Sequence, residues 1–162
     1  MLVAPEVLNH GFAPDPTYFI NTLGRMKDKR VIPYLLNVAK KVEPEKDTTN
    51  RMYSYIYSVA YAAERLADPS CVEALRVLAD KPGIRGGVVT VGSDPRRTAR
   101  GTASRRDDRY AYLELCLGRA LAHCGSERGY EILRAYANDI RGFLARSARD
   151  ELKVLSEKAS KK

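Results

Sequence analysis

Cysteine and histidine are scarce in this sequence, and their scarcity excludes several kinds of site. Among 162 residues there are two histidines and three cysteines. Cys71, Cys116 and Cys124 are too few and too irregularly spaced for a disulfide framework or a zinc site. All three fall at apolar positions of helical patterns. We therefore expect reduced thiols in the core, no bound metal or cofactor, and a cytoplasmic protein.

Long apolar runs and catalytic motifs are also missing. No stretch approaches the ~20 consecutive apolar residues that cross a bilayer, and the first residues lack the features of a signal peptide. We expect no membrane association. The sequence contains no dinucleotide fingerprint, P-loop, nucleophile elbow or His-Glu-x-x-His motif. His123 stands just before a predicted turn, where a basic group complements a helix C-terminus, so we expect no enzyme activity.

Positive charge is concentrated in one segment of the chain. The formal net charge is +8. From Lys81 to Arg109 there are eight Lys or Arg residues and three Asp, which gives +5 for 29 residues and leaves +3 for the other 133. A local excess of this kind favours an acidic partner at that segment, rather than a basic surface over the whole chain.

A short pattern occurs three times along the chain. Three segments align without gaps: residues 23–35, 63–75 and 121–133. Each ends one amphipathic helix, passes through Asp28, Asp68 or Ser126, and begins another helix. A side-chain oxygen at that position accepts hydrogen bonds from the free N–H groups of the next turn. The first two caps are 40 residues apart, a typical length for a two-helix repeat, and the next spacing of 58 indicates an insertion of 18 residues.

The apolar periodicity predicts an all-α protein. Helices are expected over these approximate ranges: 15–27, 29–42, 47–67, 69–80, 106–124 and 127–137, with a last helix capped by Asn138 or Asp139. We expect a single domain over residues 1–162. It would have an extended N-terminal segment at 1–14, an inserted basic loop at 81–105 and a frayed tail at 158–162.

The repeated pattern resembles a known family. Leu-Gly-Arg-x-x-Asp-x-x-Val-Ile-Pro-x-Leu and Ala-x-Arg-Leu-x-Asp-Pro-x-x-Val-x-x-Leu resemble HEAT-like repeats of the phycobilisome-lyase type. This resemblance implies an α-solenoid of about three helix pairs, plus a C-terminal helix and the long Gly/Arg-rich inserted loop. The third unit departs from the pattern, with Gly125-Ser126 for the usual Asp-Pro and Gly129 at a core position. The run over residues 61–141 is similar to a C-terminal extension of certain bacterial flavin-dependent oxidoreductases.

The inserted basic loop is the first candidate site. Its arginines are the expected contacts: Arg85, Arg96, Arg97, Arg100, Arg105 and Arg106. Guanidinium groups beside glycines suit phosphates or an acidic protein surface. The alternative is a solvated insertion whose charges only keep it soluble. No aromatic residue lies between Gly83 and Arg109, whereas a protein that binds single-stranded nucleic acid needs stacking rings.

A row of tyrosines is the second candidate site. Tyr53, Tyr57 and Tyr61 are spaced four residues apart, so they share one face of the predicted third helix. The row lies beside an apolar stripe, where a ring can pack while its hydroxyl stays in water. Tyrosine is favoured in interface hot spots, which suggests an aromatic patch for a partner. The alternative is packing between neighbouring repeats.

These features predict a non-catalytic protein-interaction or scaffold module. Its partner would be another protein or a covalently linked domain, and the second resemblance suggests a larger enzyme such as a flavin-dependent oxidoreductase. The alternative is a HEAT-like protein that binds nucleic acid through the arginine-rich loop. The name of the repeat family alone implies a third interpretation, a bilin lyase-type enzyme.

Overall fold

The protein is all-helical, as the sequence predicts. The computed structural model describes residues 15–46, 51–92 and 105–160. The α-helices are α1 (Pro16–Arg25), α2 (Ile32–Lys41), α3 (Arg51–Leu66), α4 (Val72–Ala79), α6 (Arg105–His123), α7 (Glu127–Tyr136) and α8 (Gly142–Ala159). Short 3-10 turns connect or precede them at Lys29–Val31, Pro44–Lys46 and Pro69–Cys71, and no strand occurs within these ranges. Among the described helices, none is long and apolar enough to span a membrane.

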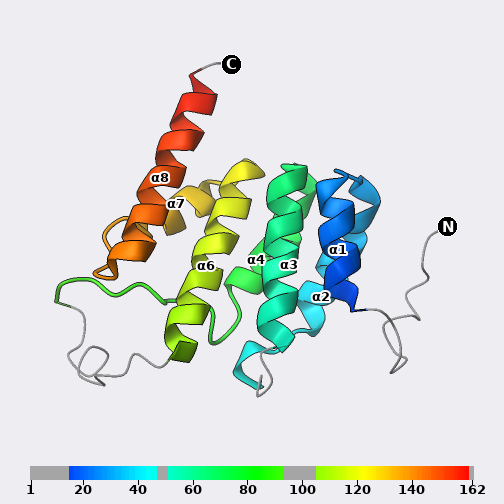
Figure 1. Ribbon diagram of the computed structural model, residues 1–162, viewed down its shortest axis with the longest axis horizontal. Helices are drawn as coiled ribbons and strands as arrows, with labels where there is room; N and C mark the ends of the chain where they lie inside the picture. Colours follow the sequence, from blue (N-terminus) through cyan, green and yellow to red (C-terminus); the bar gives the residue numbers. More distant parts are fainter. Residues whose placement is uncertain (1–14, 47–50, 93–104, 161–162) are drawn as a thin grey trace.

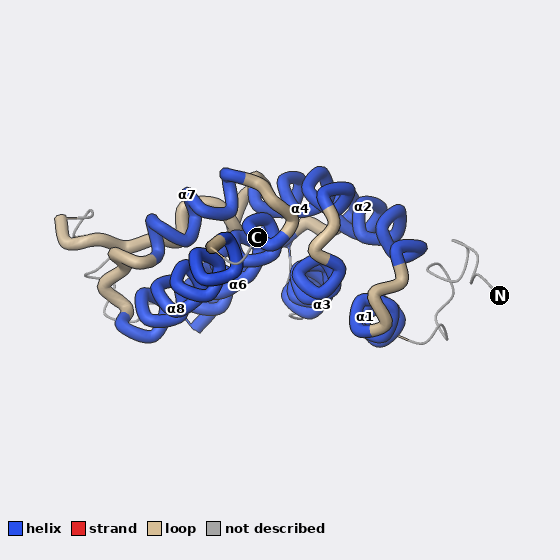
Figure 2. The backbone as a smooth tube through the Cα atoms, turned by 90° about the horizontal axis from the view of Figure 1, so that it is seen from above, coloured by secondary structure: helices blue, strands red, loops and turns tan. Residues whose placement is uncertain are grey.

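The helices form two layers (Figures 1 and 2). Helices α1, α3, α6 and α8 lie side by side in one layer, and α2, α4 and α7 lie in the other. The helices bury a shared core, with packing both across the layers and between neighbouring helices of one layer, such as α1 on α3 and α3 on α6. The largest fully buried side chains include Leu35, Ile56, Leu75, Leu113, Leu121, Leu133 and Tyr136.

The three aligned segments form the same kind of turn. Lys27, Ala67 and Gly125 each adopt a left-handed backbone conformation, with φ of 54°, 49° and 81°. The next residue is extended in each case, and its side chain was predicted to cap the following helix. Asp28 and Asp68 do so, each accepting a hydrogen bond from the amide two residues ahead, at 3.0 and 2.9 Å.

The third turn differs in its capping. Ser126 makes no side-chain capping bond to α7, so that part of the prediction was wrong. The turn is closed instead through the backbone, because the Ser126 N–H donates to the Leu121 carbonyl oxygen at 2.9 Å. The equivalent bond in the first turn runs from the Asp28 N–H to the Leu23 carbonyl oxygen at 3.0 Å. These bonds are typical of a helix that ends in a left-handed residue.

Close helix contacts explain a departure from the repeated pattern. A Cβ atom on Gly129 would lie 2.2 Å from the Ala122 amide nitrogen and 2.6 Å from the Gly118 carbonyl oxygen. Helices α6 and α7 therefore approach so closely that no side chain fits between them at this point. Gly129 is buried in this contact. The glycine occupies a core position because the backbone of the neighbouring helix fills the space of a side chain.

The last helix begins later than expected. The sequence predicted Asn138 or Asp139 as its cap, but α8 starts at Gly142 with Arg141 as the capping residue. The helix continues to Ala159 and so enters the segment 158–162 that was predicted to be frayed. The predicted N-terminal extended segment, residues 1–14, lies outside the described residues.

Candidate interaction surface

The three tyrosines of α3 form a stacked row. The ring centroids of Tyr53 and Tyr57 lie 6.5 Å apart with an interplanar angle of 4°, and those of Tyr57 and Tyr61 lie 6.5 Å apart at 18°. Tyr57, in the middle, keeps 37% of its surface exposed. Partial burial raises the pKa of the Tyr53 and Tyr57 hydroxyls. The row thus combines stacked rings with accessible ring surface.

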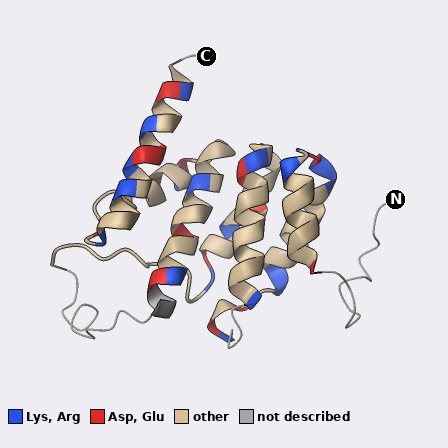
Figure 3. Ribbon diagram, viewed as in Figure 1, with Lys and Arg blue, Asp and Glu red and all other residues tan. Residues whose placement is uncertain are grey.

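The row lies within an uncharged stretch of α3. Residues 52–63 contain no charged side chain, and the charges of this helix are confined to its ends. Figure 3 shows the same distribution, with an uncharged middle of α3 between charged ends. At the C-terminal end, the Arg65 guanidinium lies over the Tyr61 ring, 5.2 Å from its centroid. This cation–π contact fixes the last ring of the row.

A group that we call the Arg119 bridge joins three helices beside this row. Arg119 on α6 contacts Glu64 on α3 at 3.0 Å and Glu151 on α8 at 3.1 Å. The second contact is an ion pair without hydrogen-bond geometry, since Arg119 Nε makes no hydrogen bond. His123 Nε2 lies 2.8 Å from the other Glu151 oxygen. The bridge consists of these four residues.

Within the Arg119 bridge, neighbouring groups shift the pKa values of Glu151 and Arg119 toward their ionised forms. The hydrogen bond with His123 lowers the pKa of Glu151, against the effect of burial, and Arg119 lowers it further. Burial alone would lower the pKa of Arg119, but Glu64 and Glu151 outweigh this effect and raise it. Glu151 and Arg119 therefore stay ionised at neutral pH, and their ion pair holds α8 against α6.

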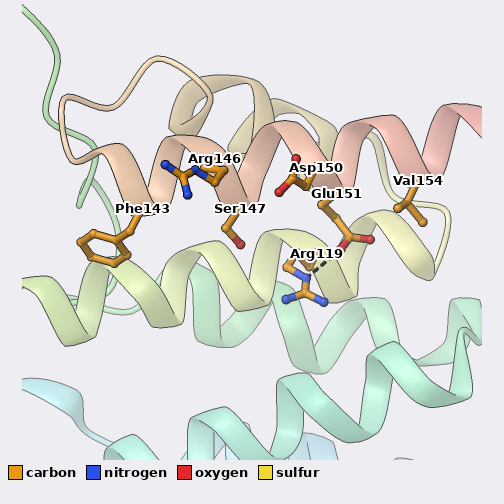
Figure 4. A pocket seen from close by; sticks show the side chains of 7 residues that line it. All are labelled: Arg119, Phe143, Arg146, Ser147, Asp150, Glu151 and Val154. Carbon is orange, nitrogen blue, oxygen red and sulfur yellow. Dashed lines mark ion pairs between the residues drawn. The ribbon is translucent and has the colours of Figure 1, made fainter.

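An open groove lies between α6 and α8, next to the bridge (Figure 4). Its volume is about 400 Å³. The lining residues come from one side of α8 and from α6: Phe143, Arg146, Ser147, Asp150, Glu151, Val154 and Arg119. Phe143 is 56% exposed and Val154 41% exposed. Arg119 thus belongs both to the groove and to the bridge that reaches α3, which makes the groove and the tyrosine row neighbours on the same layer.

A buried carboxylate on α6 binds the backbone at the start of the inserted segment. Glu114 on α6 accepts hydrogen bonds from the backbone N–H groups of Gly86 at 3.0 Å and Gly87 at 2.7 Å. It also accepts from the Tyr136 hydroxyl at 2.8 Å. Only 6% of Glu114 is exposed. Three donors therefore replace the water that this carboxylate would otherwise need, and burial together with Glu114 raises the pKa of Tyr136.

A second carboxylate holds the same segment a little further along. Asp139 accepts from the Val89 amide at 2.9 Å, and the Ile140 amide donates to the Val89 carbonyl oxygen at 2.9 Å. Arg141 pairs with Asp139 at 2.7 Å and donates to the Gly87 carbonyl oxygen. Although burial opposes it, Arg141 keeps the pKa of Asp139 low. We call Glu114, Tyr136, Asp139 and Arg141 the insertion clamp.

The structure places only one arginine of the predicted basic site in full. Arg85 is exposed, immediately before the clamped glycines. Arg96, Arg97 and Arg100 lie outside the described residues. Arg105 and Arg106 open helix α6, but their side chains lie outside the described part. By contrast, the three tyrosines predicted as a site lie together. The groove and both polar clusters were missed, and only the spacing of Phe143, Ser147 and Val154 along one helix face could have signalled the groove.

Comparisons with protein-family models, with curated proteins and with solved structures return no match to this chain. Among the described residues, no group of three or more His, Cys, Asp or Glu side chains is placed to hold a metal ion. The accessible features are the tyrosine row and the groove.

Proposed function

We propose that this chain is a non-catalytic protein-interaction module that docks a partner on the tyrosine row and the α6–α8 groove. The module would be an α-solenoid of three HEAT-like helix pairs, α1/α2, α3/α4 and α6/α7, closed by α8. The two layers and the shared left-handed turns support this architecture, because each pair contributes one helix to each layer. The partner is another protein or a covalently linked domain, such as part of a flavin-dependent oxidoreductase.

The observation that carries this proposal is the stacked, half-exposed tyrosine row on an uncharged helix face. Tyrosine contributes a large contact area with few rotatable bonds, so ordering it on binding costs little entropy. The contact of Tyr53 and Tyr61 with Tyr57 restrains these rings further. Beside the row, the exposed Phe143 and Val154 extend the apolar surface across the groove. A few aromatic anchors ringed by polar groups are typical of protein interfaces.

The charge distribution favours protein over nucleic acid as the partner. A nucleic-acid site needs a continuous basic track along the phosphates. The middle of α3 is uncharged, and the Arg119 guanidinium in the adjoining groove is already paired with two carboxylates. Binding to nucleic acid remains the alternative outcome, and it would depend on the arginines of residues 81–105.

The test uses a matched pair of tyrosine substitutions. A photo-crosslinking residue at position 57 identifies the partner, and the affinity of the purified complex is then measured at physiological salt. Tyr57→Ala should weaken binding at least tenfold, equivalent to about 1.4 kcal/mol. Tyr130→Ala is the control, because Tyr130 lies on α7 in the other layer and also carries an arginine over its ring. Its affinity should match that of the unchanged protein.

Two results would overturn the proposal. The first is a partner that binds equally well to the Tyr57→Ala variant and to the unchanged protein. The second is micromolar or tighter binding of duplex or single-stranded nucleic acid at physiological salt. If replacing Arg96, Arg97, Arg105 and Arg106 by Ala abolished that affinity, the nucleic-acid alternative would replace the interaction module.

A further inference from the structure

Helices α3 and α6 share one surface of the molecule. They lie side by side and run in the same direction (Figure 1). Of the α6 residues 110–123, only Tyr112, Arg119 and His123 are not buried, and their spacing of 7 and 4 residues places them on one face. Arg119 contacts Glu64 of α3 at 3.0 Å, and Glu64 follows the middle tyrosine of the row by seven residues. This face of α6 therefore adjoins the tyrosine row.

Four tyrosines form the uncharged middle of this surface, the three of the row and Tyr112. Residues 52–63 of α3 contain no charged side chain. On α6, the only charged residue between Arg109 and Arg119 is Glu114, which is buried in the insertion clamp. We call this surface the α3–α6 face. It consists of the tyrosine row, Tyr112 and the charged residues at the two ends: Arg51 and Arg109 at one, Glu64, Arg65 and Arg119 at the other.

Arginines stand at both ends of the α3–α6 face. Arg51 and Arg109 lie near the N-terminal ends of α3 and α6, and both are exposed. Neither forms an ion pair with another described side chain, and Asp108 beside Arg109 pairs with the arginine of the insertion clamp. At the other end, Arg65 is exposed, whereas Arg119 is paired with two carboxylates. The exposed charged groups of the face are therefore all positive.

We propose that the α3–α6 face binds an acidic amphipathic helix of the partner, with apolar residues on the tyrosines and carboxylates at the arginine ends. This inference rests on the proposed function and names the chemistry of its partner. Arg51 and Arg65 are 14 residues apart on one helix, which corresponds to about 21 Å. A docked helix of similar length covers the tyrosines and reaches both ends. Helices that bind in this way present apolar residues at i, i+3, i+4 and i+7.

Two other occupants fit the α3–α6 face less well. Single-stranded nucleic acid carries a phosphate at every nucleotide, so its binding sites place positive charge along the whole path of the strand. Here the arginines stand only at the ends, with an uncharged stretch between them. A second copy of the same face is also disfavoured, because it would bring the arginines of the two copies together.

The experiment selects ligands on the intact protein. A phage-displayed library of random peptides of about 16 residues, long enough to span the face, is selected on the full chain at physiological salt. The enriched peptides are synthesised with a fluorescent label, and their dissociation constants are measured by fluorescence anisotropy. Peptides whose affinity falls at least about tenfold on the Tyr57→Ala variant are ligands of the α3–α6 face.

These ligands should carry Asp or Glu near their ends, with apolar residues at helical spacing between them. Arg51→Glu and Arg109→Glu should each weaken binding at least about fivefold. Arg76→Glu is the control, because it makes the same charge change at an exposed position of α4, in the other layer, and it should leave the affinity unchanged.

A charge exchange separates lost contacts from a damaged fold. Each ligand is also made with lysine in place of the acidic residues at one end or at the other. Both peptides should bind the unchanged protein more weakly. One of them should regain affinity on the Arg109→Glu variant, which only a folded variant with the intact tyrosine row can produce.

Failure of this inference is distinguishable from failure of the docking surface. Ligands that depend on Tyr57 but bind both charge-reversed variants within about twofold of the unchanged protein would leave the surface in place and overturn its acidic partner. A selection in which no peptide depends on Tyr57 would overturn both. Tighter binding of an oligothymidine than of the peptides, lost in Tyr57→Ala, would assign the face to nucleic acid. A dimer that dissociates in Tyr57→Ala would assign it to a second copy.

Discussion

Two polar clusters flank α6, and they differ in what their charges bind. In the insertion clamp, Glu114 and Asp139 accept hydrogen bonds from backbone amides of a segment that has no helix of its own. In the Arg119 bridge, charged side chains from three helices bind one another. Both clusters join parts of the chain that are far apart in sequence. Only the clamp, however, binds backbone groups of a non-helical segment.

This difference should determine how much each cluster contributes to the free energy of unfolding. A buried donor that loses its acceptor keeps its full desolvation cost, and the clamp contains such a donor in the Tyr136 hydroxyl, which is bound by Glu114. A partly exposed carboxylate that loses an arginine can rotate and hydrate. Arg119 is 27% exposed and Glu64 25% exposed, whereas the Asp139 side chain is fully buried. We therefore expect the clamp to be the more costly cluster to break.

The largest effect is expected for Glu114→Ala. This change removes the acceptor of the Gly87 amide and of the buried Tyr136 hydroxyl, so the free energy of unfolding should fall by about 3–5 kcal/mol. Urea denaturation measures the loss. The exposed Glu131→Ala is the control, and its change should stay within about 0.5 kcal/mol. A loss below 1 kcal/mol for Glu114→Ala would show that water replaces the carboxylate.

The second effect tests how closely the clamped segment approaches α6. A Cβ on Gly87 would lie 2.6 Å from the Tyr136 hydroxyl oxygen and 2.9 Å from Ala111 Cα. Gly87→Ala should therefore cost about 2 kcal/mol through overpacking. Gly142→Ala is the matched change, since nothing lies within 4 Å of its Cβ position, and it should stabilise the protein by about 0.5 kcal/mol. Equal thermal unfolding curves for the two variants would contradict the close approach.

A smaller effect is expected from the Arg119 bridge. Arg119→Met roughly keeps the volume of the side chain but leaves Glu64 without its arginine and Glu151 with His123 alone, so the free energy of unfolding should fall by about 1–2 kcal/mol. The control is Arg134→Met, because Arg134 and its partner Glu127 are both largely exposed and their pair should contribute almost nothing. A cost for Arg119→Met as large as that of Glu114→Ala would remove the distinction between the two clusters.

The smallest effect is a pH dependence carried by the bridge. The pKa of Glu151 is lowered below its usual 4.5 in the folded protein. A group with a lowered folded pKa stabilises the fold above its unfolded pKa, and this contribution is lost as the pH falls through the folded value. Between pH 5 and pH 3 the unchanged protein should therefore lose more stability than Glu151→Gln. Parallel losses in urea titrations of the two proteins would exclude this role of Glu151.

Local chemistry made much of the fold predictable. Asp28 and Asp68 follow helix ends and cap the next turn, and the 3.6-residue periodicity located the helices to within a few residues. The tyrosine row was also predictable, because residues four apart on one helix must share a face. These features depend on neighbours in sequence.

The polar clusters depend instead on distant parts of the chain. Nothing near Glu114 in sequence shows that its partners are amides almost 30 residues earlier. Asn138 or Asp139 was predicted to cap the last helix, but Arg141 is the capping residue, and the Asp139 side chain is bound by Val89 and Arg141 instead. Gly129 departs from the repeated pattern, and the close approach of α7 to α6 explains why a glycine stands there. The groove depends on the angle at which α8 lies, which periodicity does not determine.

The tyrosine row also gives the protein an optical reporter. The chain contains ten tyrosines and no tryptophan, so tyrosine emission is not lost by energy transfer to an indole. Stacked rings 6.5 Å apart couple their near-ultraviolet transitions, which makes the row a distinct source of circular dichroism. A partner that covers Tyr57 would change both signals, and Tyr57→Phe would alter the middle chromophore of the row. Docking on this face can therefore be followed without any attached label.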